Sequence, residues 1–461
     1  MKKVTSAQVL GLFYKAAKQV CLSACLSLLL SPISFAATYS VVSTESLKQQ
    51  LLSVVAGDTI VLSAGEYRGH FEIHQAISLI GEKGAIIDAK GRGSAVSIFS
   101  SDVTLSNLVI QNWGGDLYEL NAGILIKEQA QRVRVESSQL QGDGFGIYAE
   151  NTSHITVVNN VIAGNPALYK LDRGDGVYLK GVDVSVIHDN AISDVRDGVY
   201  LETSTNSLVF DNRFHSAQYG IHYMYTKHDE AYGNQVDNVD GGYAIMSSEF
   251  VNLHQNQASN TLDFGILLNI SNQCIVSNNR MSLGHNPQGT AELGNEGKGI
   301  FIYGARDNEV THNLFSDNDI GIYMAMGGEK NKVYGNQFVN NKTQVKYVGD
   351  TLLEWSYEGR GNYWSGYMGW DTNHDGIADK AYRPNDSLDK LFWLYPEARF
   401  LMNSPVVALL RWVQGQFEFG PATGIVDSFP ILAPSVQSLS LQSSTLLSLD
   451  DEHLPNEAGM Q

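Results

Sequence analysis

The sequence predicts an all-β protein folded as a right-handed parallel β-helix, a solenoid whose coils are each about 22 residues long. Three observations predict this fold. Glycine recurs at that period through the middle of the chain, asparagine follows most of these glycines by about 14 residues, and three further positions of the repeat are almost always apolar. A fixed period of this length is typical of stacked coils that share one core.

The first 36 residues have the pattern of a secretory signal peptide. A basic stretch is followed by an apolar run over residues 20–30, and Ser34-Phe35-Ala36 places small residues where a signal peptidase cleaves. The alternative is a lipoprotein box at Leu22-Ser23-Ala24-Cys25, but most of the apolar segment follows this cysteine. We therefore expect residues 1–36 to be removed from an exported protein.

Composition limits the classes of function that fit the rest of the chain. No later apolar run reaches the ~20 residues that cross a bilayer, so we expect a soluble or peripheral protein that another protein holds at any membrane. The formal net charge of -18 makes nucleic acid an unsuitable partner. Of the three cysteines, two precede the expected cleavage site, which leaves Cys274 without a disulfide partner.

A cap precedes the regular coils. Residues 44–54 are predicted to form a helix, followed by the first strands at residues 58–62 and 77–79. Without such a helix the first coil would expose an open sheet edge, which favours association with other chains. The predicted β-helix then runs over residues 37–345.

Three rows of the repeat are predicted to face the inside of the tube, because a stacked parallel sheet needs a uniformly apolar inner face. The row directly after the glycines reads Ile124, Ile147, Val177, Val199, Ile221, Tyr243, Ile266, Ile300 and Ile322. The rows on either side of the asparagines read Val157, Ile187, Val209, Ala231, Leu253, Val276, Val310 and Val333, and Ile162, Ile192, Phe214, Val236, Ala258, Met281, Phe315 and Phe338.

The glycines and asparagines themselves are interpreted as corners. We expect each asparagine to adopt a left-handed backbone and its amide to bond to the coils above and below, and each glycine to allow a tight bend. Cys274 lies two residues before inward Val276, so we expect a buried thiol. Two coils are enlarged, around residues 168–170 and 285–296, and should form flanking loops of the kind that often carry binding.

Positions two and four after each glycine should point outward. Position two is an aromatic-rich row: Leu125, Tyr148, Tyr178, Tyr200, His222, Ala244, Leu267, Phe301 and Tyr323. Position four includes Met224 and Met246, which would lie on neighbouring coils about 4.8 Å apart. Imidazole and thioether together suit Cu(I), so His222, Met224 and Met246 are a candidate copper site; the alternative is an apolar stripe for a partner surface.

The repeats stop near Asn341, and residues 346–432 are predicted to form an aromatic and helical extension. Asp371, Asn373, Asp375 and Asp379 lie at alternate positions around Gly376, as oxygen ligands do in calcium loops. The final bidentate Glu of an EF-hand is absent, because Tyr382 occupies that position. The alternatives are therefore a structural Ca²⁺ site and a metal-free hairpin rich in Asp and Asn.

The extension also contains two apolar segments, at residues 391–395 and 406–414. Ser404-Pro405 is a good helix start, and Gly415 is a plausible end. Both segments are too apolar for free surface and too short to span a membrane, so we expect them to dock on a membrane partner; the alternative is packing against the last coil. Residues 433–461 lack periodicity and are expected to be a flexible tail.

Beyond these patterns, the chain resembles the NosD family, the periplasmic maturation proteins of nitrous oxide reductase. The resemblance rests on the Gly220-Ile-His-Tyr-Met224 coil and above all on GNYWSGYMGWDTNHDGIADKAYRP (residues 361–384) and SPVVALLRWVQ (residues 404–414). It implies a non-catalytic periplasmic protein, held at the inner membrane by the permease and ATPase subunits of an ABC-type complex. It further implies that copper passes from a donor chaperone to nitrous oxide reductase.

Two other functions fit the same sequence. One is a scaffold that docks the reductase without binding metal. The other is a polysaccharide lyase or epimerase, because an aromatic stripe can stack on sugars and Asp172-Arg173-Gly174-Asp175 brings carboxylates and a base together. Against the enzyme, the outward row beside Tyr200 and His222 supplies only Glu202 as a further carboxylate, and such chemistry needs a cluster of them.

Overall fold

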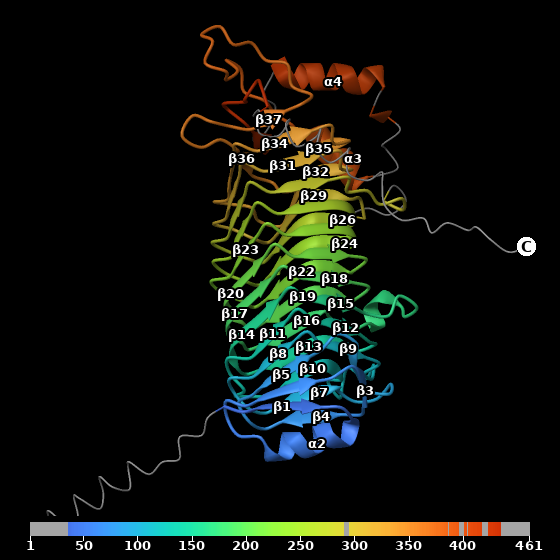
Figure 1. The fold of residues 1–461 in the computed structure, drawn as a ribbon. Coiled ribbons are helices and arrows are strands. Elements are labelled where there is room, and N and C mark those ends of the chain that lie inside the picture. The colour runs from blue at the N-terminus through green and yellow to red at the C-terminus, as the bar shows by residue number, and fades with distance from the viewer. Residues whose placement is uncertain are drawn as a thin grey trace, which may run out of the picture.

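The computed structural model describes residues 36–289, 295–385, 387–395, 401–402, 404–416 and 423–434. Its body is a parallel β-helix, so the predicted fold is confirmed (Figure 1). The predicted signal peptide, apart from Ala36, and most of the predicted tail lie outside the described residues. Every pairing between the strands of the tube is parallel, as expected when each coil stacks on the one before.

Each coil contributes strands to three faces of the tube. The first face is a sheet of 13 strands. It consists of β1 (Thr38–Val41), β2 (Thr59–Leu62), β5 (Ser78–Gly81), β8 (Thr104–Ser106), β11 (Arg134–Glu136), β14 (Ser153–Val158), β17 (Asp183–His188), β20 (Thr205–Phe210), β23 (Glu230–Tyr232), β25 (Asn252–His254), β27 (Ile275–Ser277), β30 (Glu309–Thr311) and β33 (Lys332–Tyr334).

The second and third faces form one continuous sheet, because β24 (Gln235–Met246) and β26 (Gln257–Asn269) run through both. The second face also contains β3 (Gly65–Arg68), β6 (Ala85–Asp88), β9 (Val109–Gln111), β12 (Gln139–Gln141), β15 (Val161–Ala163), β18 (Ala191–Ser193), β21 (Arg213–His215), β28 (Arg280–Ser282), β31 (Leu314–Ser316), β34 (Gln337–Val339) and β37 (Tyr363–Trp364). The third also contains β4 (Phe71–Ile73), β7 (Val96–Ile98), β10 (Ala122–Ile126), β13 (Phe145–Glu150), β16 (Val177–Lys180), β19 (Asp197–Glu202), β22 (Tyr219–Met224), β29 (Lys298–Tyr303), β32 (Ile320–Ala325) and β35 (Thr343–Tyr347).

The three predicted inward rows fill the tube. All their members belong to one buried cluster that runs the length of the solenoid. The register also matches the prediction, since Ile147, Val177, Val199 and Ile221 are successive partners across neighbouring strands. Cys274 is buried as expected, and burial raises the pKa of its thiol to about 11.

The predicted asparagine ladder is present, with one correction. Each amide joins three coils: the Asn160 side chain, for example, donates to the Val135 carbonyl and to Oδ1 of Asn190, which also accepts the Asn160 backbone N–H. The left-handed backbone, however, falls on the residue before each asparagine, such as Asn159 and Asp189. The asparagine itself keeps an ordinary backbone because its side chain must point inward to reach both neighbouring coils.

The role predicted for the glycine row was wrong. None of these glycines, from Gly123 to Gly321, has a positive φ, and most of them lie within third-face strands. What excludes a side chain is close approach of the next coil: a Cβ on Gly198 would lie 2.5 Å from the Gly220 carbonyl oxygen and 2.3 Å from the Phe214 ring. The glycines therefore allow tight stacking, and they do not form bends.

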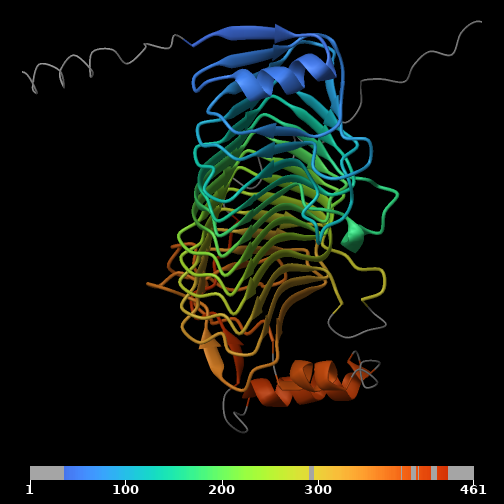
Figure 2. The ribbon, with the colours of Figure 1, turned by 90° about the horizontal axis from the view of Figure 1, so that it is seen from below.

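Helix α2 (Thr44–Ser53) caps the N-terminal end of the tube (Figure 2). Ser43 and Ser46 form a reciprocal capping box at its start, and Leu47 and Leu51 are buried against the first coils. The preceding strand β1 was not predicted; it pairs with β2 along its whole length. Tyr67 secures this end, since its buried hydroxyl donates to the Val41 carbonyl oxygen at 2.6 Å.

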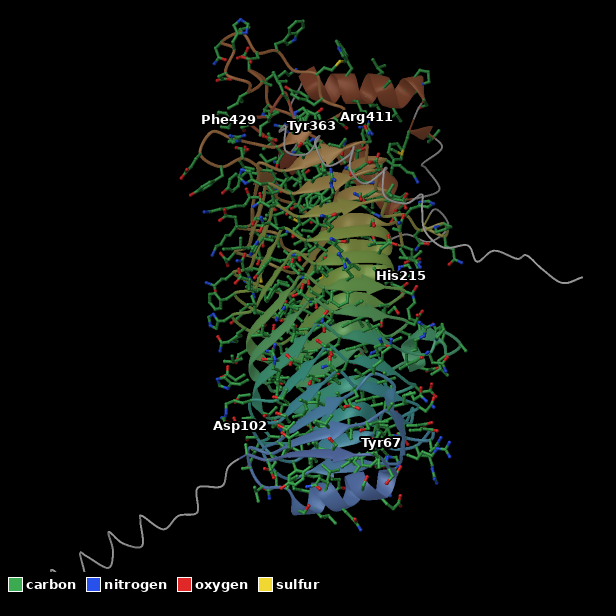
Figure 3. All side chains as sticks on the ribbon, viewed as in Figure 1. Tyr67, Asp102, His215, Tyr363, Arg411 and Phe429 are labelled. Carbon is green, nitrogen blue, oxygen red and sulfur yellow. The ribbon has the colours of Figure 1, made fainter. Side chains whose placement is uncertain are left out.

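The C-terminal extension closes the other end. Its strand β37 pairs with β34, so the tube continues past the last regular coil, while β36 (Leu352–Glu354) pairs with β38 (Gly424–Val426). Asn362 extends the asparagine ladder and Asp427 terminates it. Helices α3 (Ser387–Leu394) and α4 (Pro405–Gln416) lie at this end, where Tyr363, Arg411 and Phe429 are also found (Figures 1 and 3).

Candidate functional site

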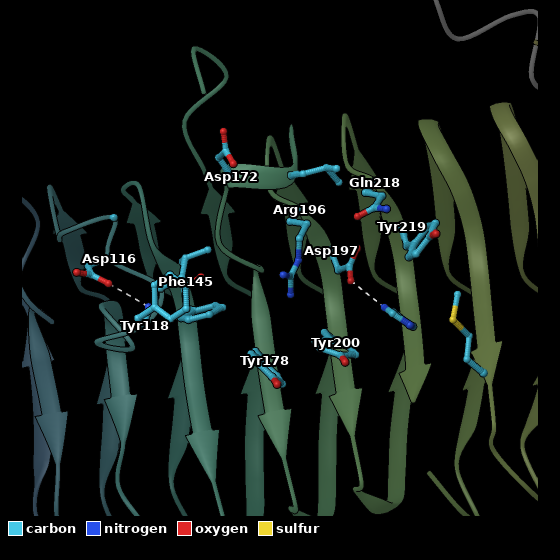
Figure 4. Close-up of a pocket in the computed structure, with 15 residues that line it drawn as sticks. Asp116, Tyr118, Phe145, Asp172, Tyr178, Arg196, Asp197, Tyr200, Gln218 and Tyr219 are labelled. Atoms are coloured by element: carbon cyan, nitrogen blue, oxygen red, sulfur yellow. Dashed lines mark hydrogen bonds and ion pairs between the residues drawn. The ribbon is translucent and has the colours of Figure 1, made fainter. Parts of the chain in front are cut away.

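A pocket of about 950 Å³ opens on the outside of the third face. Its floor includes Tyr178, Tyr200 and His222 from three successive strands, β16, β19 and β22. Residues 115–118 line it from one loop, and Leu171 and Asp172 line it from the first enlarged coil, whose short helix η1 spans Lys170–Asp172. The first enlarged coil, which was predicted to form a flanking loop, therefore lies beside this pocket (Figure 4).

A chain of charged side chains crosses three coils beside this floor. Asp175 is fully buried and accepts two hydrogen bonds from the Arg196 guanidinium, at 2.9 and 2.6 Å. It also accepts the backbone N–H of Asp197, at 3.0 Å. Asp197 in turn lies 2.9 Å from Nδ1 of His222, through its Oδ2 atom. The four residues therefore form one connected network that ends at an imidazole ring. Figure 4 shows Arg196 and Asp197 of this network at the pocket.

Two polar atoms of this network have no hydrogen-bond partner although they are buried. They are Nε2 of His222 and Oδ1 of Asp197. Only 9% of His222 and 2% of Asp197 is exposed. Leaving a buried polar atom unpaired costs free energy, so such atoms at a pocket indicate a group that binds there.

The aromatic side chains of the floor stack on one another along the solenoid. Ring centroids lie 4.6 Å apart between Tyr178 and Tyr200, and again between Tyr200 and His222. Tyr219 meets His222 edge to face at 5.2 Å. Ring faces that contact each other are not open to a sugar, so this stripe does not provide the stacking platform on which the carbohydrate hypothesis depended.

Burial controls the protonation of the groups around the pocket. It raises the pKa of Asp175 to about 7, with the nearby Asp197 carboxylate adding to the effect and Arg196 opposing it. It also raises the pKa of Tyr219 to about 12 and that of Tyr200 further. The tyrosines therefore stay protonated at neutral pH, and neither of these two phenols is a ready phenolate base for lyase chemistry.

The three predicted copper ligands lie outside the core of the tube, on adjacent strands. Met224 is two residues after His222 on β22, and it is the register partner of Met246 on β24. His222 and Met246 line the pocket, whereas Met224 does not. The expectation that all three face solvent needs correction, because the neighbouring rings bury His222 and both methionines are half-buried.

Nitrogen, thiolate and carboxylate groups alone do not form a metal site here. Within the described residues no three His, Cys, Asp or Glu side chains are grouped so as to hold an ion. Met246, which lines the same pocket as His222, offers a thioether, a ligand type that suits Cu(I).

The predicted calcium loop is an exposed turn closed by its own side chains. Oδ1 of Asp371 accepts the backbone N–H of His374 at 2.6 Å, and its Oδ2 accepts that of Gly376 at 2.9 Å. These bonds hold the pKa of Asp371 below its ordinary value. Asp379 accepts hydrogen bonds from Thr372, and the Asn373 amide donates to Asp375. This arrangement suits both alternatives, and calcium binding stays a prediction.

The predicted docking segments expose much of their apolar surface. On α4, Val406, Leu409 and Trp412 are 67%, 60% and 61% exposed, whereas Val407 is buried. Leu391 and Tyr395, at the end of α3, are exposed as well. None of the helices in the described part of the chain has both the length and the apolar character needed to cross a bilayer.

Sequence reasoning missed the row of residues directly before the repeating glycines. It places Asp197 in the pocket lining and buried Asp175 behind it, so Glu202 of the outward row is not the only carboxylate near Tyr200 and His222. The repeated Asp-Gly pairs at 175–176 and 197–198, with Arg196 between them, were the available signal. Arg173, by contrast, bonds to the carbonyls of Pro166, Leu168 and Ser216 and so holds the enlarged coil in place.

Comparison with known proteins shows the family to which the chain belongs. The family model described as "Periplasmic copper-binding protein (NosD)" matches residues 158–369. A protein of Stutzerimonas stutzeri named "Probable ABC transporter binding protein NosD" is 44% identical over 381 residues, which are 82% of this chain and 87% of the relative. A Pseudomonas aeruginosa protein of the same name is 46% identical over 373 residues, 80% of this chain and 87% of that protein.

Solved structures match the fold at low sequence identity. The A-module of the Azotobacter vinelandii mannuronan C-5 epimerase AlgE6 aligns with a TM-score of 0.53 and 12% identity, covering 70% of this chain and 94% of that module. DFA-IIIase from Arthrobacter chlorophenolicus A6 aligns with a TM-score of 0.50 and 14% identity, covering 68% and 96% of the two chains. At this identity the likeness concerns the β-helix alone.

Proposed function

Because the chain belongs to the NosD family of periplasmic copper-binding proteins, we propose that it helps deliver copper to nitrous oxide reductase. In this proposal it is the soluble, non-catalytic subunit of an ABC-type complex. It receives Cu(I) from a donor chaperone in the periplasm and passes it to the reductase, while a permease and an ATPase on other chains supply the membrane anchor and the energy.

The observation that carries the copper proposal is the unpaired Nε2 atom of His222. It is a buried nitrogen donor at a pocket that Met246 also lines. Cu(I) accepts electron pairs from imidazole and thioether groups and needs few ligands, so this donor set fits the ion. Met224, the register partner of Met246, is the third proposed ligand.

The residues around the pocket also favour a cation over an acidic sugar. Asp116, Asp172 and Asp197 line it, while the Arg196 charge is paired with the Asp175 carboxylate. A uronate chain would meet carboxylates of its own sign there, whereas a copper ion would be attracted. This is the physical argument against a polysaccharide lyase or epimerase.

Anaerobic titration with Cu(I), against a chelator of known affinity, tests the proposal. We expect the protein to take up copper, and the triple variant His222→Ala, Met224→Ala, Met246→Ala to lose one equivalent without a change in fold by circular dichroism. The matched control His188→Ala, Met326→Ala, Met368→Ala removes one imidazole and two thioethers elsewhere and should keep that equivalent. Absence of uptake by the unchanged protein would favour the metal-free scaffold.

The apolar C-terminal end supports the association with membrane subunits. Val406, Leu409 and Trp412 are exposed on α4. This helix lies at the end of the solenoid (Figure 1), and such apolar side chains are costly to leave in water. Their counterparts would be apolar surfaces of the permease. The relatives' name, ABC transporter binding protein, agrees with an attachment of this kind.

Co-purification with the permease and ATPase tests this attachment. We expect deletion of residues 391–418, or the triple change Val406→Ser, Leu409→Ser, Trp412→Ser, to release the protein from the complex. The control Leu52→Ser alters a side chain that is 88% exposed on α2, at the opposite end, and should leave the complex intact. Continued co-purification of the triple variant would contradict docking through α4.

A further inference from the structure

We infer that Asp197 is a positioning residue: it selects the tautomer of His222 and so presents the Nε2 lone pair at the pocket for a soft metal cation. The inference deepens the copper proposal and rests on it, because a lone pair held in this way has use only if an electron-pair acceptor binds there. Asp197 itself need not touch the metal.

The geometry of the pair determines where the imidazole proton sits. Oδ2 of Asp197 lies 2.9 Å from Nδ1 of His222, and a carboxylate can only accept a hydrogen bond. Nδ1 must therefore carry the proton. In the neutral ring this leaves Nε2 as the free electron-pair donor, and Nε2 is the nitrogen without a partner.

The ring is also held against rotation. Tyr200 stacks on one side of His222 with an interplanar angle of 24°, and Tyr219 approaches edge-on at 88°. With two aromatic neighbours and a carboxylate bond, the imidazole has one favoured orientation before any ligand arrives. An imidazole that is already oriented loses less entropy when it binds a metal ion. Carboxylates that hydrogen-bond to a metal-binding histidine raise the affinity for the metal in this way.

Asp197 is itself fixed by the coil beneath it. Its backbone N–H donates to Oδ1 of Asp175, and the same carboxylate binds Arg196 through two hydrogen bonds. Because Asp175, Asp197 and His222 belong to successive coils, the stacking of the solenoid sets the position of the histidine. The stacking of successive coils thus holds Nε2 of His222 in a position without a hydrogen-bond partner.

Other histidines provide an internal comparison. Nδ1 of His188 lies 2.6 Å from Asp189, and Nε2 of His254 lies 2.8 Å from Glu230, both on the outer side of the first face. Among the described residues, His222 is the one histidine with a buried ring nitrogen that has no partner. Histidines elsewhere on the outside of the tube therefore also have carboxylate partners. What distinguishes His222 is a buried ring nitrogen without a partner.

The experiment combines the tautomer of the copper-free protein with Cu(I) affinity, in the full chain and in Asp197→Asn. Two-dimensional ¹⁵N NMR of labelled histidines, with His222→Gln for assignment, reports which ring nitrogen is protonated. We expect the Nδ1–H form of His222 in the unchanged protein. In Asp197→Asn we expect a shift toward the Nε2–H form, because an amide can donate to Nδ1. We also expect this variant to bind Cu(I) 10- to 100-fold more weakly than the unchanged protein. The control Asp189→Asn alters the His188 pair and should change neither value for His222.

The two readouts separate this inference from the copper proposal. Absence of Cu(I) uptake by the unchanged protein would overturn the copper proposal, while the tautomer would still test Asp197. An Nε2–H form in the unchanged protein would overturn the positioning role, even if Asp197→Asn failed to fold. A folded Asp197→Asn that kept both tautomer and affinity would overturn it as well.

Discussion

Asp427 shows how a single residue can set a pH dependence at the C-terminal end. Its fully buried carboxylate accepts the backbone N–H of Asn362 at 2.7 Å and the indole N–H of Trp364 at 2.8 Å. No cation balances it among these contacts, and burial raises its pKa from 3.8 to about 6. The folded protein therefore holds this proton more tightly than the unfolded chain does.

This difference predicts the sign of a stability change. A carboxyl group with a raised pKa in the folded state makes folding less favourable as pH rises from about 4 to about 6, by roughly 3 kcal/mol for a shift of this size. Asp427→Asn keeps an acceptor for Asn362 and Trp364 but cannot ionise. Urea unfolding between pH 4 and 7 should show the unchanged protein losing stability relative to the variant. Parallel pH curves for the two proteins would contradict this.

At the scale of elements, the asparagine ladder stabilises the corner of each coil that joins the first face to the second. The Asn234 amide donates to the carbonyls of Val209 and Tyr232 and to Oδ1 of Asn256, while its own oxygen accepts from Asn212. Asn234→Ala would leave several buried groups unpaired, and we expect a loss of about 2–4 kcal/mol in the free energy of unfolding. Chemical denaturation measures it. The control Asn252→Ala, which removes one half-buried side-chain bond to Glu230, should cost less than half as much.

Strand stacking depends on the glycine row in a different way. Gly198→Ala would push a Cβ to 2.3 Å from the Phe214 ring and 2.5 Å from a backbone oxygen, which the neighbouring coils cannot absorb without shifting. We expect Gly198→Ala to lower the free energy of unfolding by about 1–3 kcal/mol or more. In Gly366→Ala the new Cβ has no neighbour within 4 Å, so thermal unfolding should be unchanged there. Equal melting temperatures for the two variants would refute the stacking role.

The predicted calcium loop is a turn that its own side chains already close. Asp371 accepts backbone N–H groups from both His374 and Gly376, as the first ligand of a calcium loop does when the turn is formed. If Ca²⁺ binds, its addition after EDTA treatment should raise the melting temperature, and Asp371→Ala should abolish the rise. Mg²⁺ at the same concentration serves as the control, because it needs a tighter octahedral site. Identical melting in EDTA and Ca²⁺ would support the metal-free hairpin.

At the scale of the whole molecule, the solenoid is closed differently at its two ends. Helix α2 covers the N-terminal coil with Leu47 and Leu51, and the extension covers the other end with β37, β38 and Asp427. Uncovered ends of a β-solenoid expose sheet edges and core side chains, so we expect both caps to prevent end-to-end association.

The capping role of α2 predicts different outcomes for a buried and an exposed leucine of this helix. Leu47→Ala removes a fully buried side chain from the cap and should destabilise the protein by about 2–4 kcal/mol, with end-to-end association visible in sedimentation velocity. Leu52→Ala alters a side chain that is 88% exposed on the same helix and should change neither property. If Leu47→Ala were as stable and monomeric as Leu52→Ala, α2 would not act as the cap.

The sequence by itself determined the tube, its register and the inner rows, because a repeat of constant length makes each position of a coil equivalent to the same position in the next. The same equivalence predicts that His222, Met224 and Met246 lie outside the core of the tube, on adjacent strands. The resemblance to NosD proteins added a family that the relatives confirm.

Only the tertiary structure decided which side chains meet across the corners of a coil. Asp175, Arg196 and Asp197 lie near the bend where the third face begins, and alternation along a strand does not say where a side chain points at a bend. Neighbouring rings likewise determined that His222 is buried. Periodicity thus specifies inside and outside, whereas the contacts that fix one tautomer at one nitrogen depend on how successive coils pack.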